Sequence, residues 1–241
     1  MTEPALLWPG GPRLCPDGAF PPGTDSILLA DFIRPGAAAR GIDLGCGSGL
    51  LTLLLAHKSE RLRMIGLEIR ESAVRAARET LRLNALEERA SVVEGDIRRC
   101  RELFAAGSFD LVAANPPYFA LGAGAVSPRD GRAAARAETD CTLAQLADAA
   151  AWLCRTGGSF SLVYRPERLA ELTVCLSARG LEPKRLRFVC HRADSAPSLV
   201  LLEARRGGRP GLRVEPMLIL ELPDGSESPE YKRIYHREET T

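Results

Sequence analysis

Short apolar runs alternate with amphipathic stretches along most of the chain. Runs of about four to eight residues rich in Val, Ile and Leu predict buried strands, whereas apolar residues spaced three and four apart predict helices. Strands that alternate with helices indicate a parallel sheet covered on both faces. In chain order the pattern predicts helix 24–34, strand 40–44, helix 49–57, strand 63–68, helix 71–84, strands 90–94 and 109–114, helix 140–155, strand 158–164, helix 166–179, and strands 184–191, 197–204 and 214–222.

The last strands of this pattern cannot all run parallel. Only residues 192–196 link the strands 184–191 and 197–204, and a crossover between parallel strands needs about a dozen residues or more. One strand of this pair must therefore be antiparallel. The seven strands from 40–44 to 197–204 predict an α/β fold with a doubly wound, seven-stranded, mostly parallel sheet and an antiparallel closing strand, and 214–222 follows as a last strand.

The 241 residues are about the length of one domain with a sizeable core. We expect a lead segment at 1–23, the main domain at 24–222 with a substrate loop at 118–139, and a polar tail at 223–241. The sequence contains no apolar run of about eighteen residues and no basic-plus-apolar leader. We therefore expect a cytoplasmic protein without a membrane span.

A glycine-rich turn follows the strand at 40–44. The stretch Asp43-Leu44-Gly45-Cys46-Gly47-Ser48-Gly49 places three glycines at alternate positions. Glycine permits positive φ and close approach of the backbone to a ligand, which would lie beside the N-terminus of the following helix. The spacing differs from the dinucleotide pattern G-x-G-x-x-G. The acid Asp43 before the turn suits a ligand with a cationic amino group, such as S-adenosylmethionine (AdoMet), although a tight turn without a ligand is the alternative from this motif alone.

Two further acids lie at the ends of the next two strands. Glu68 ends the strand 63–68, where a carboxylate can accept both ribose hydroxyls, and Asp96 follows the strand 90–94, where it can accept from an adenine amino group. Three acids in this order resemble the class I AdoMet-dependent methyltransferases, whose fold is Rossmann-like, over residues 20–205. Gly23-Thr24-Asp25 reads as a helix start with Thr24 or Asp25 as its cap. The cofactor residues implied by the resemblance are Thr24, Asp25, Asp43, Gly45, Cys46, Gly47, Gly49, Glu68, Ile69, Asp96, Ile97 and Asn115.

The tetrapeptide Asn115-Pro116-Pro117-Tyr118 follows the apolar strand 109–114. The side-chain oxygen of Asn115 and the carbonyl of Pro116 can accept hydrogen bonds from an amino group and orient its nitrogen toward a methyl donor. The prolines stiffen the loop and remove two donors, and Tyr118 offers a face on which a planar group stacks. We therefore expect these four residues to be catalytic. A proline turn that merely ends a strand is the structural alternative.

The tetrapeptide resembles that of N6-adenine methyltransferases and of glutamine methyltransferases that modify release factors. Later segments separate the two groups, because they look like the bacterial tRNA1(Val) (adenine-N6)-methyltransferase family, which modifies the adenine 3′ of the anticodon in tRNA. That resemblance spans residues 14–235. The segments that carry it are Gly23-Thr24-Asp25, Phe119, Gly122, Pro128-Arg129-Asp130, Ala133 to Glu138, Arg165 to Leu169, Gly180 to Arg185, Pro197 to Glu203 and Tyr231 to Tyr235.

Two other functions stay open from the sequence. One is another amino methyltransferase of the same fold, acting on a protein glutamine N5 or on a guanine N2 in rRNA. Only about forty residues precede Gly41, too few for the helical domain that release-factor methyltransferases usually carry there. The other is a non-catalytic AdoMet-binding or RNA-binding scaffold, which has no need of an intact Asn-Pro-Pro-Tyr.

The charge distribution bears on an RNA substrate more than the net charge of +1 does. Residues 179–213 hold nine Arg or Lys against three acids, although genome composition also produces an excess of arginine. Basic groups near the catalytic loop are suited to a phosphate backbone. The seven cysteines form no Cys-x-x-Cys pair, so we expect reduced thiols and no metal site. The expected RNA-contacting residues are Tyr118, Phe119, Arg129, Arg132, Arg136, Lys184 and Arg185.

Overall fold

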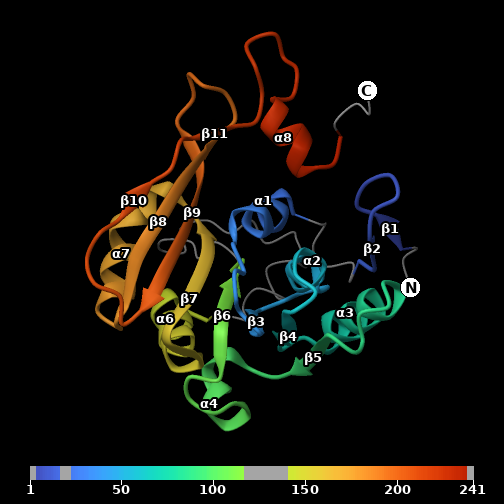
Figure 1. Cartoon of the computed structure of the whole chain (residues 1–241), viewed down its shortest axis with the longest axis vertical. Coiled ribbons are helices and arrows are strands. Elements are labelled where there is room, and N and C mark those ends of the chain that lie inside the picture. Colours follow the sequence, from blue (N-terminus) through green and yellow to red (C-terminus); the bar gives the residue numbers. More distant parts are fainter. Residues whose placement is uncertain (1–3, 17–22, 117–140, 238–241) are drawn as a thin grey trace, which may run out of the picture.

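The structure, a computed structural model, describes residues 4–16, 23–116 and 141–237. Within these residues a nine-stranded sheet runs through the molecule, with helices on both faces (Figure 1). Its strands are β3 (Arg40–Leu44), β4 (Arg63–Glu68), β5 (Ala90–Glu94), β6 (Phe109–Ala114), β7 (Cys154–Tyr164), β8 (Leu181–Cys190), β9 (Pro197–Arg206), β10 (Arg213–Val214) and β11 (Leu218–Ile219). Neighbouring strands follow the order β10-β8-β9-β7-β6-β3-β4-β5, and β11 also pairs with β8.

Helices cover the two faces of the sheet separately (Figure 1). The first face carries α1 (Thr24–Phe32), α2 (Leu50–Lys58), α3 (Glu71–Leu83) and α8 (Pro229–Ile234), and the second carries α4 (Cys100–Leu103), α6 (Leu143–Leu153) and α7 (Leu169–Ser177). Two turns of 3₁₀ helix, η1 (Ile97–Arg99) and η2 (Pro166–Arg168), precede α4 and α7. A separate hairpin of β1 (Ala5–Leu6) and β2 (Arg13–Leu14) lies against α3.

Side chains of the central strands alternate between two hydrophobic cores. Along β9, Leu199 and Leu201 enter the core on the first face, and Val200 and Leu202 enter the core on the second. Successive side chains of a strand point to opposite faces, so a strand buried on both sides is apolar at every position. This is why the continuous apolar runs of the sequence predict central strands.

β9 runs antiparallel to both of its neighbours, β7 and β8. The other strand pairs in the sheet are parallel. The predicted doubly wound, mostly parallel sheet with an antiparallel strand is therefore confirmed.

The carboxyl ends of β3, β4, β5 and β6 meet at one edge of the sheet, here called the carboxyl edge. The chain leaves β3 toward β4 and β5, then crosses back to β6 on the other side of β3. Such a reversal of strand order opens a crevice beside the carboxyl ends, where α/β folds bind their ligands. Register pairs Asp43 with Ala113 and Leu44 with Leu67, and this brings the next positions, Gly45, Glu68 and Asn115, to one level.

The structure corrects two of the predicted elements near the C-terminus. Instead of one strand at 214–222, two strands of two residues each, β10 and β11, pair in parallel with β8. Pro216, which has no N–H to donate, lies between them and interrupts the ladder. The stretch expected as a polar tail contains α8, and Ile234 and Tyr235 are buried against the core on the first face.

The predicted side-chain cap of the first helix is also wrong. Gly23 occupies the N-cap position of α1, and no side chain caps the helix there. Thr24 and Asp25 lie in the first turn, where the negative charge of Asp25 is favourable for the helix dipole. The side chain of Thr24 hydrogen-bonds with Tyr235, so the chain beyond α8 contacts the start of α1.

Candidate functional site

The glycine turn between β3 and α2 depends on backbone conformations that glycine adopts easily. Gly45, Gly47 and Gly49 have φ values of +74°, +55° and +84°. The Gly45 N–H donates to the Leu67 carbonyl at 2.8 Å, which fastens the turn to β4. No described atom lies within 4 Å of the position that a Cβ on Gly47 would take. The turn therefore presents an open backbone surface at the carboxyl edge.

Glu68 braces this turn from the end of β4. Its carboxylate is buried and accepts a hydrogen bond from the Gly47 N–H at 2.8 Å through Oε2. Oε1 accepts from the Arg70 N–H at 2.9 Å, and the Arg70 Nε lies 3.4 Å away. Oε2 has a second lone pair beside the one that receives the Gly47 N–H, so Glu68 retains capacity for a ligand hydroxyl.

Asp43 is fully buried at the end of β3. The Thr52 hydroxyl donates to its Oδ2 at 2.8 Å, and none of the ion pairs within the described residues includes Asp43. Burial, with a smaller contribution from the charge of Glu68, raises the pKa of the Asp43 carboxyl to about 7. A buried acid of this kind is stabilised in its charged form by a cation that binds nearby.

Cys46 fills space inside the turn. A Cβ on Gly66 would lie 2.6 Å from the Cys46 Sγ, so the thiol occupies the room that Gly66 leaves. Burial raises the pKa of the thiol well above its ordinary value. Cys46 is therefore an unreactive packing residue in this state.

The third acid, Asp96, caps the turn η1 that follows β5. Its Oδ1 accepts from the Arg98 N–H at 2.8 Å, and the Arg98 guanidinium pairs with Oδ2 at 2.6 Å. Hydrogen bonding to Arg98 holds the pKa of this carboxyl below its usual value. The Ile97 side chain lies 3.7 Å from a Cβ position on Gly45, while Ile69 beyond β4 is exposed.

Asn115, directly after β6, is oriented by a residue from α1. The Asn115 Nδ2 donates to the Ser26 Oγ at 2.8 Å. Ser26 lies in the first turn of α1 and is buried, with 9 % of its surface exposed. The first turn of α1, the glycine turn and the end of β6 therefore converge at the carboxyl edge.

Part of the predicted site lies outside the described residues. Pro116 is described and buried. The predicted site residues that lie outside the described residues are Pro117, Tyr118, Phe119, Arg129, Arg132 and Arg136.

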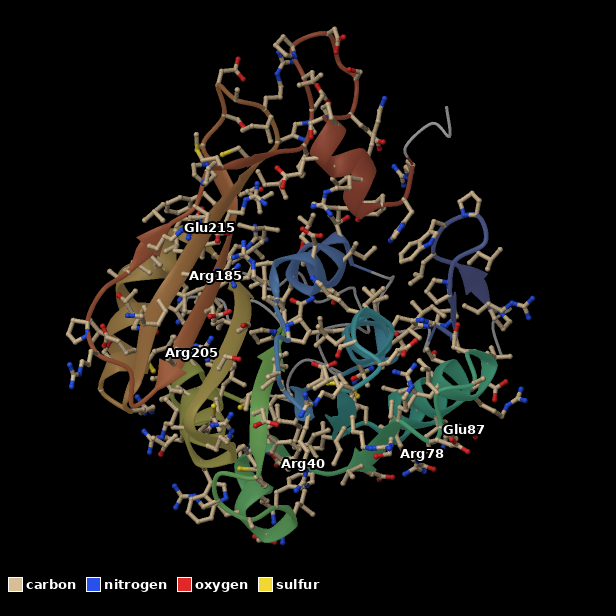
Figure 2. The ribbon with its side chains drawn as sticks, in the orientation of Figure 1. Arg40, Arg78, Glu87, Arg185, Arg205 and Glu215 are labelled. Atoms are coloured by element: carbon tan, nitrogen blue, oxygen red, sulfur yellow. The ribbon has the colours of Figure 1, made fainter. Side chains whose placement is uncertain are left out.

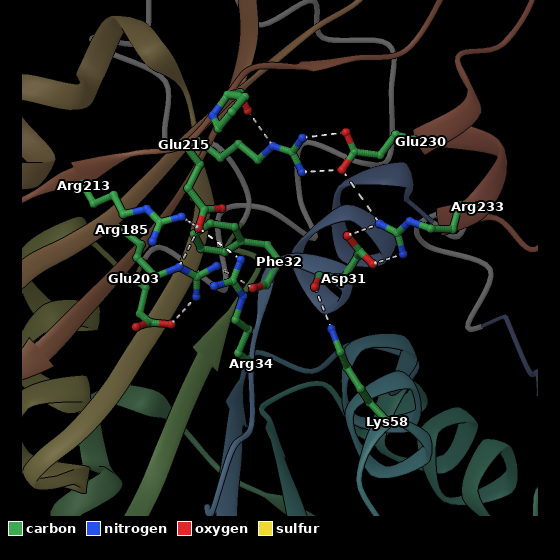
Figure 3. Close-up of polar contacts among 12 residues, drawn as sticks. Asp31, Phe32, Arg34, Lys58, Arg185, Glu203, Arg213, Glu215, Glu230 and Arg233 are labelled. Atoms are coloured by element: carbon green, nitrogen blue, oxygen red, sulfur yellow. Dashed lines mark hydrogen bonds and ion pairs between the residues drawn. The ribbon is translucent and has the colours of Figure 1, made fainter.

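The structure places Arg185 in a buried ion-pair cluster instead of on an RNA-facing surface. Its guanidinium pairs with Glu203 at 2.8 Å and with Glu215 at 3.1 Å, and it donates to the Phe32 carbonyl (Figure 3). Arg185 and Glu215 lie together beside the middle of β8 (Figure 2). This geometry argues against the predicted phosphate contact of Arg185, because both carboxylates would lose their one buried cation among the described residues and keep only more exposed arginines as partners.

Lys184, the neighbour of Arg185, lies six residues before the end of β8. At about 3.3 Å per residue, that is roughly 20 Å from the end of the strand. Its Nζ donates to the Arg209 carbonyl at 3.0 Å. The two residues therefore do not share the carboxyl edge with Asn115.

Two residues of the site were missed by the sequence analysis, Ser26 and Thr52. Ser26 directly follows the Thr24-Asp25 pair, and its polar side chain is the only one between Asp25 and Asp31. Thr52 is the one polar residue in the run Leu50 to Ala56. A lone hydroxyl at the start of an otherwise apolar helix is the signal that could have identified both.

Comparison with known proteins identifies the family. The family model described as "Methyltransferase small domain" matches residues 22–171. The tRNA1(Val) (adenine(37)-N6)-methyltransferase of Tolumonas auensis is 33 % identical over 210 residues, which are 87 % of this chain and 85 % of that protein. The chain belongs to the tRNA1(Val) (adenine-N6)-methyltransferase family. The resemblance drawn from the sequence motifs is thus confirmed.

A second relative agrees with this family, and a solved structure agrees with the fold. The Aeromonas hydrophila protein of the same name is 33 % identical over 215 residues, 87 % of this chain and 86 % of that protein. A predicted O-methyltransferase from Agrobacterium tumefaciens superimposes with a TM-score of 0.70 at 22 % identity, covering 89 % of this chain and 96 % of that one. At that identity the structural match concerns the fold alone, and it agrees with a Rossmann-like methyltransferase sheet.

Two properties of the described residues concern metal ions and membranes. Among residues 4–16, 23–116 and 141–237, no group of three or more His, Cys, Asp or Glu is arranged to hold a metal ion. In the same part of the chain no helix is long and apolar enough to span a membrane.

Proposed function

We propose that this methyltransferase transfers a methyl group from AdoMet to the N6 amino group of an adenine in tRNA, in the anticodon loop beside the anticodon. The observation that carries the proposal is the orientation of Asn115 at the carboxyl edge, where its Nδ2 donates to Ser26 and its Oδ1 is left as an acceptor. The two relatives named above are both called tRNA1(Val) (adenine(37)-N6)-methyltransferases, and their names suggest the substrate.

The residues around the glycine turn fit AdoMet. The buried Asp43, with its raised pKa and without an ion-pair partner among the described residues, suits the ammonium of the methionine part. Glu68 suits the ribose hydroxyls, and the open side of Gly47 lets the ligand approach the backbone. Asp96 is proposed to accept from the adenine amino group, beside Ile97 and Ile69, with Thr24 and Asp25 at the methionine end. When bound, AdoMet supplies a methyl group on a sulfonium.

The chain itself orients the target nitrogen. The Asn115 Oδ1 and the Pro116 carbonyl are proposed to accept the two N–H groups of the adenine amine, which turns the nitrogen lone pair toward the methyl donor. In the transfer that this arrangement would support, the nitrogen would gain a bond to the methyl carbon as the carbon–sulfur bond breaks and leaves a thioether, and the nitrogen would then release one proton to solvent. The two acceptors stabilise the positive charge that develops on the amine before the proton leaves. No strong base is required for this role.

RNA binding is assigned to the substrate loop at 118–139. Tyr118 and Phe119 are proposed to stack on the target adenine once it leaves the anticodon loop, where unstacking costs little. Arg129, Arg132 and Arg136 are proposed to hold phosphates.

The test of this proposal is methyl transfer from labelled AdoMet to total tRNA lacking the modification, followed by nucleoside analysis. We expect label in N6-methyladenosine. A protein that instead methylates a release-factor glutamine, or guanine N2 in rRNA, while leaving tRNA unchanged would contradict the proposed substrate. A protein that binds AdoMet but labels none of the three would be a scaffold.

A further inference from the structure

Asn115 carries an amide whose two ends have opposite hydrogen-bonding character. The Oδ1 end only accepts hydrogen bonds and the Nδ2 end only donates them, yet the two ends have nearly the same shape. A target amine presents N–H donors, so only Oδ1 can receive it. An Asn115 side chain rotated by half a turn would place donor against donor and would hold the amine poorly.

We propose that Ser26 is the positioning residue that fixes the orientation of the Asn115 amide. The Nδ2 of Asn115 donates to the Ser26 Oγ at 2.8 Å, so the nitrogen end is engaged on the α1 side and Oδ1 is the end left for substrate. The two residues are 89 positions apart in the chain, and α1 and β6 bring them together. This proposal rests on the proposed role of Asn115 in amine methylation.

The helix that carries Ser26 is fixed along its length. Ile27, Leu28 and Leu29 are buried in the core on the first face, so the first turn cannot shift without disturbing that core. The Ser26 N–H also donates to the Gly23 carbonyl at 3.2 Å. The hydroxyl is therefore presented from a rigid element, which is what precise orientation of a catalytic group requires.

Cations hold the other end of α1. Lys58 Nζ donates to the Ala30 carbonyl at 2.7 Å. It also donates to the Asp31 carbonyl at 2.6 Å, and Arg185 Nη2 donates to the Phe32 carbonyl at 3.1 Å (Figure 3). The last carbonyls of a helix lack partners within the helix, and positive charge there is favourable for the helix dipole. The ion-pair cluster around Arg185 therefore helps to hold α1 in place, and with it Ser26.

The experiment compares Ser26→Ala, Ser26→Thr and Ser161→Ala in the full chain, with labelled AdoMet and unmodified total tRNA. Ser26→Ala should lower kcat about 10- to 100-fold, the scale of a misplaced reacting group, while the AdoMet Kd and the KM for tRNA stay within about threefold. Ser26→Thr keeps the hydroxyl and should retain most of the activity. Ser161 is a matched control, because it is buried and its hydroxyl has no hydrogen-bond partner among the described residues; its alanine variant should keep wild-type turnover.

A double-mutant cycle separates positioning from other roles. If Ser26 acts through Asn115, then Ser26→Ala should cause no further loss in an Asn115→Ala background. Equal losses in both backgrounds, wild-type turnover in Ser26→Ala, or a loss confined to AdoMet affinity would each overturn the proposal. If Ser26→Ala does not fold, Ser26→Cys replaces it, since sulfur is a weak acceptor, and equal rates for the Thr and Cys variants would overturn the proposal.

Wild-type activity distinguishes this inference from the proposed function. Wild-type protein that is inactive on tRNA but active on a release-factor glutamine contradicts the tRNA substrate alone, and the same variants are then compared on that glutamine. Wild-type protein inactive on both contradicts the role of Asn115 and, with it, the role given to Ser26.

Discussion

Replacement of Asp43 by Asn should remove a pH dependence from the stability of the ligand-free protein. Burial raises the pKa of the Asp43 carboxyl from 3.8 to about 7. Because the pKa in the folded state is raised, the carboxyl contributes stability that is fully present below about pH 4 and is lost as the pH rises through about 7. This difference in pKa between the folded and unfolded states corresponds to roughly 4 kcal/mol in total, of which roughly 2–3 kcal/mol is lost between about pH 5 and pH 8.

Asn suits this test because it keeps the shape of the side chain and an oxygen that can accept the Thr52 hydroxyl. Urea unfolding at about pH 5 and pH 8, without AdoMet, measures the effect. The free energy of unfolding of the wild type should fall by roughly 2–3 kcal/mol relative to that of Asp43→Asn over this interval. Identical pH profiles for the two proteins would refute the reasoning that the buried carboxyl titrates near neutral pH.

AdoMet binding should also depend on the ionisation of Asp43, but it should strengthen as the pH rises, whereas the stability of the ligand-free protein falls. An ammonium ligand favours the ionised carboxylate, whose fraction rises from about one eleventh at pH 6 to one half at pH 7 for a pKa of about 7. The AdoMet affinity of the wild type should therefore strengthen roughly fivefold between pH 6 and pH 7. A free α-amino group titrates above this interval, so the ammonium of the ligand stays charged throughout. Calorimetry checks this, and an AdoMet Kd that stays flat across the interval would contradict the placement of the ammonium beside Asp43.

Three other changes have expected results. Glu68→Ala should weaken AdoMet binding, measured by calorimetry, about 10- to 100-fold, because the ribose and the Gly47 N–H both lose their hydrogen-bond acceptor. Glu68→Gln keeps an acceptor and should weaken AdoMet binding less. Asn115→Ala should reduce methyl transfer by about two orders of magnitude or more with little change in AdoMet affinity, and near-wild-type turnover would exclude its assigned role. Arg185→Met should lower the free energy of unfolding by about 3 kcal/mol, because two buried carboxylates lose their buried cation and keep only more exposed arginines. Arg34→Met, at an exposed arginine that pairs with one of these carboxylates, should cost less than about 1 kcal/mol. Similar losses in these two arginine variants would contradict the distinction.

The sequence predicted the central strands well because each is defined by a local pattern. The bounds of β3, β4, β5 and β6 agree with those expected from their apolar runs. Elements that depend on partners elsewhere were predicted less well. The expected strand at 214–222 failed because pairing with β8, together with Pro216, limits it to two short pieces. Residues 229–234 have the composition of a polar tail, but Ser228 caps the helix and Pro229 lies at its start, which are local helix signals that the prediction did not use. Packing against α1 and β11, which no local pattern shows, holds the helix in place.

Arg185 shows why composition alone misassigns a basic residue. The segment 179–213 is rich in arginine, which is what a phosphate-binding surface would also look like in sequence. The partners of Arg185 are Glu203, 18 positions away, Glu215, 30 positions away, and Phe32, 153 positions away. At these separations no local sequence pattern indicates them. Its charge is used within the fold, where it neutralises buried acids and caps the end of α1.

Ser26 lies in the first turn of α1, and Arg185 contacts the other end of the same helix. Nothing in the sequence around Asn115 indicates what orients its amide, because the partner comes from a helix 89 residues earlier in the chain. The family motif identifies which residue meets the substrate, whereas the fold determines which end of that residue faces it. A chain with an intact Asn-Pro-Pro-Tyr but without a hydrogen-bond acceptor at the Ser26 position should therefore bind AdoMet normally and transfer methyl groups slowly.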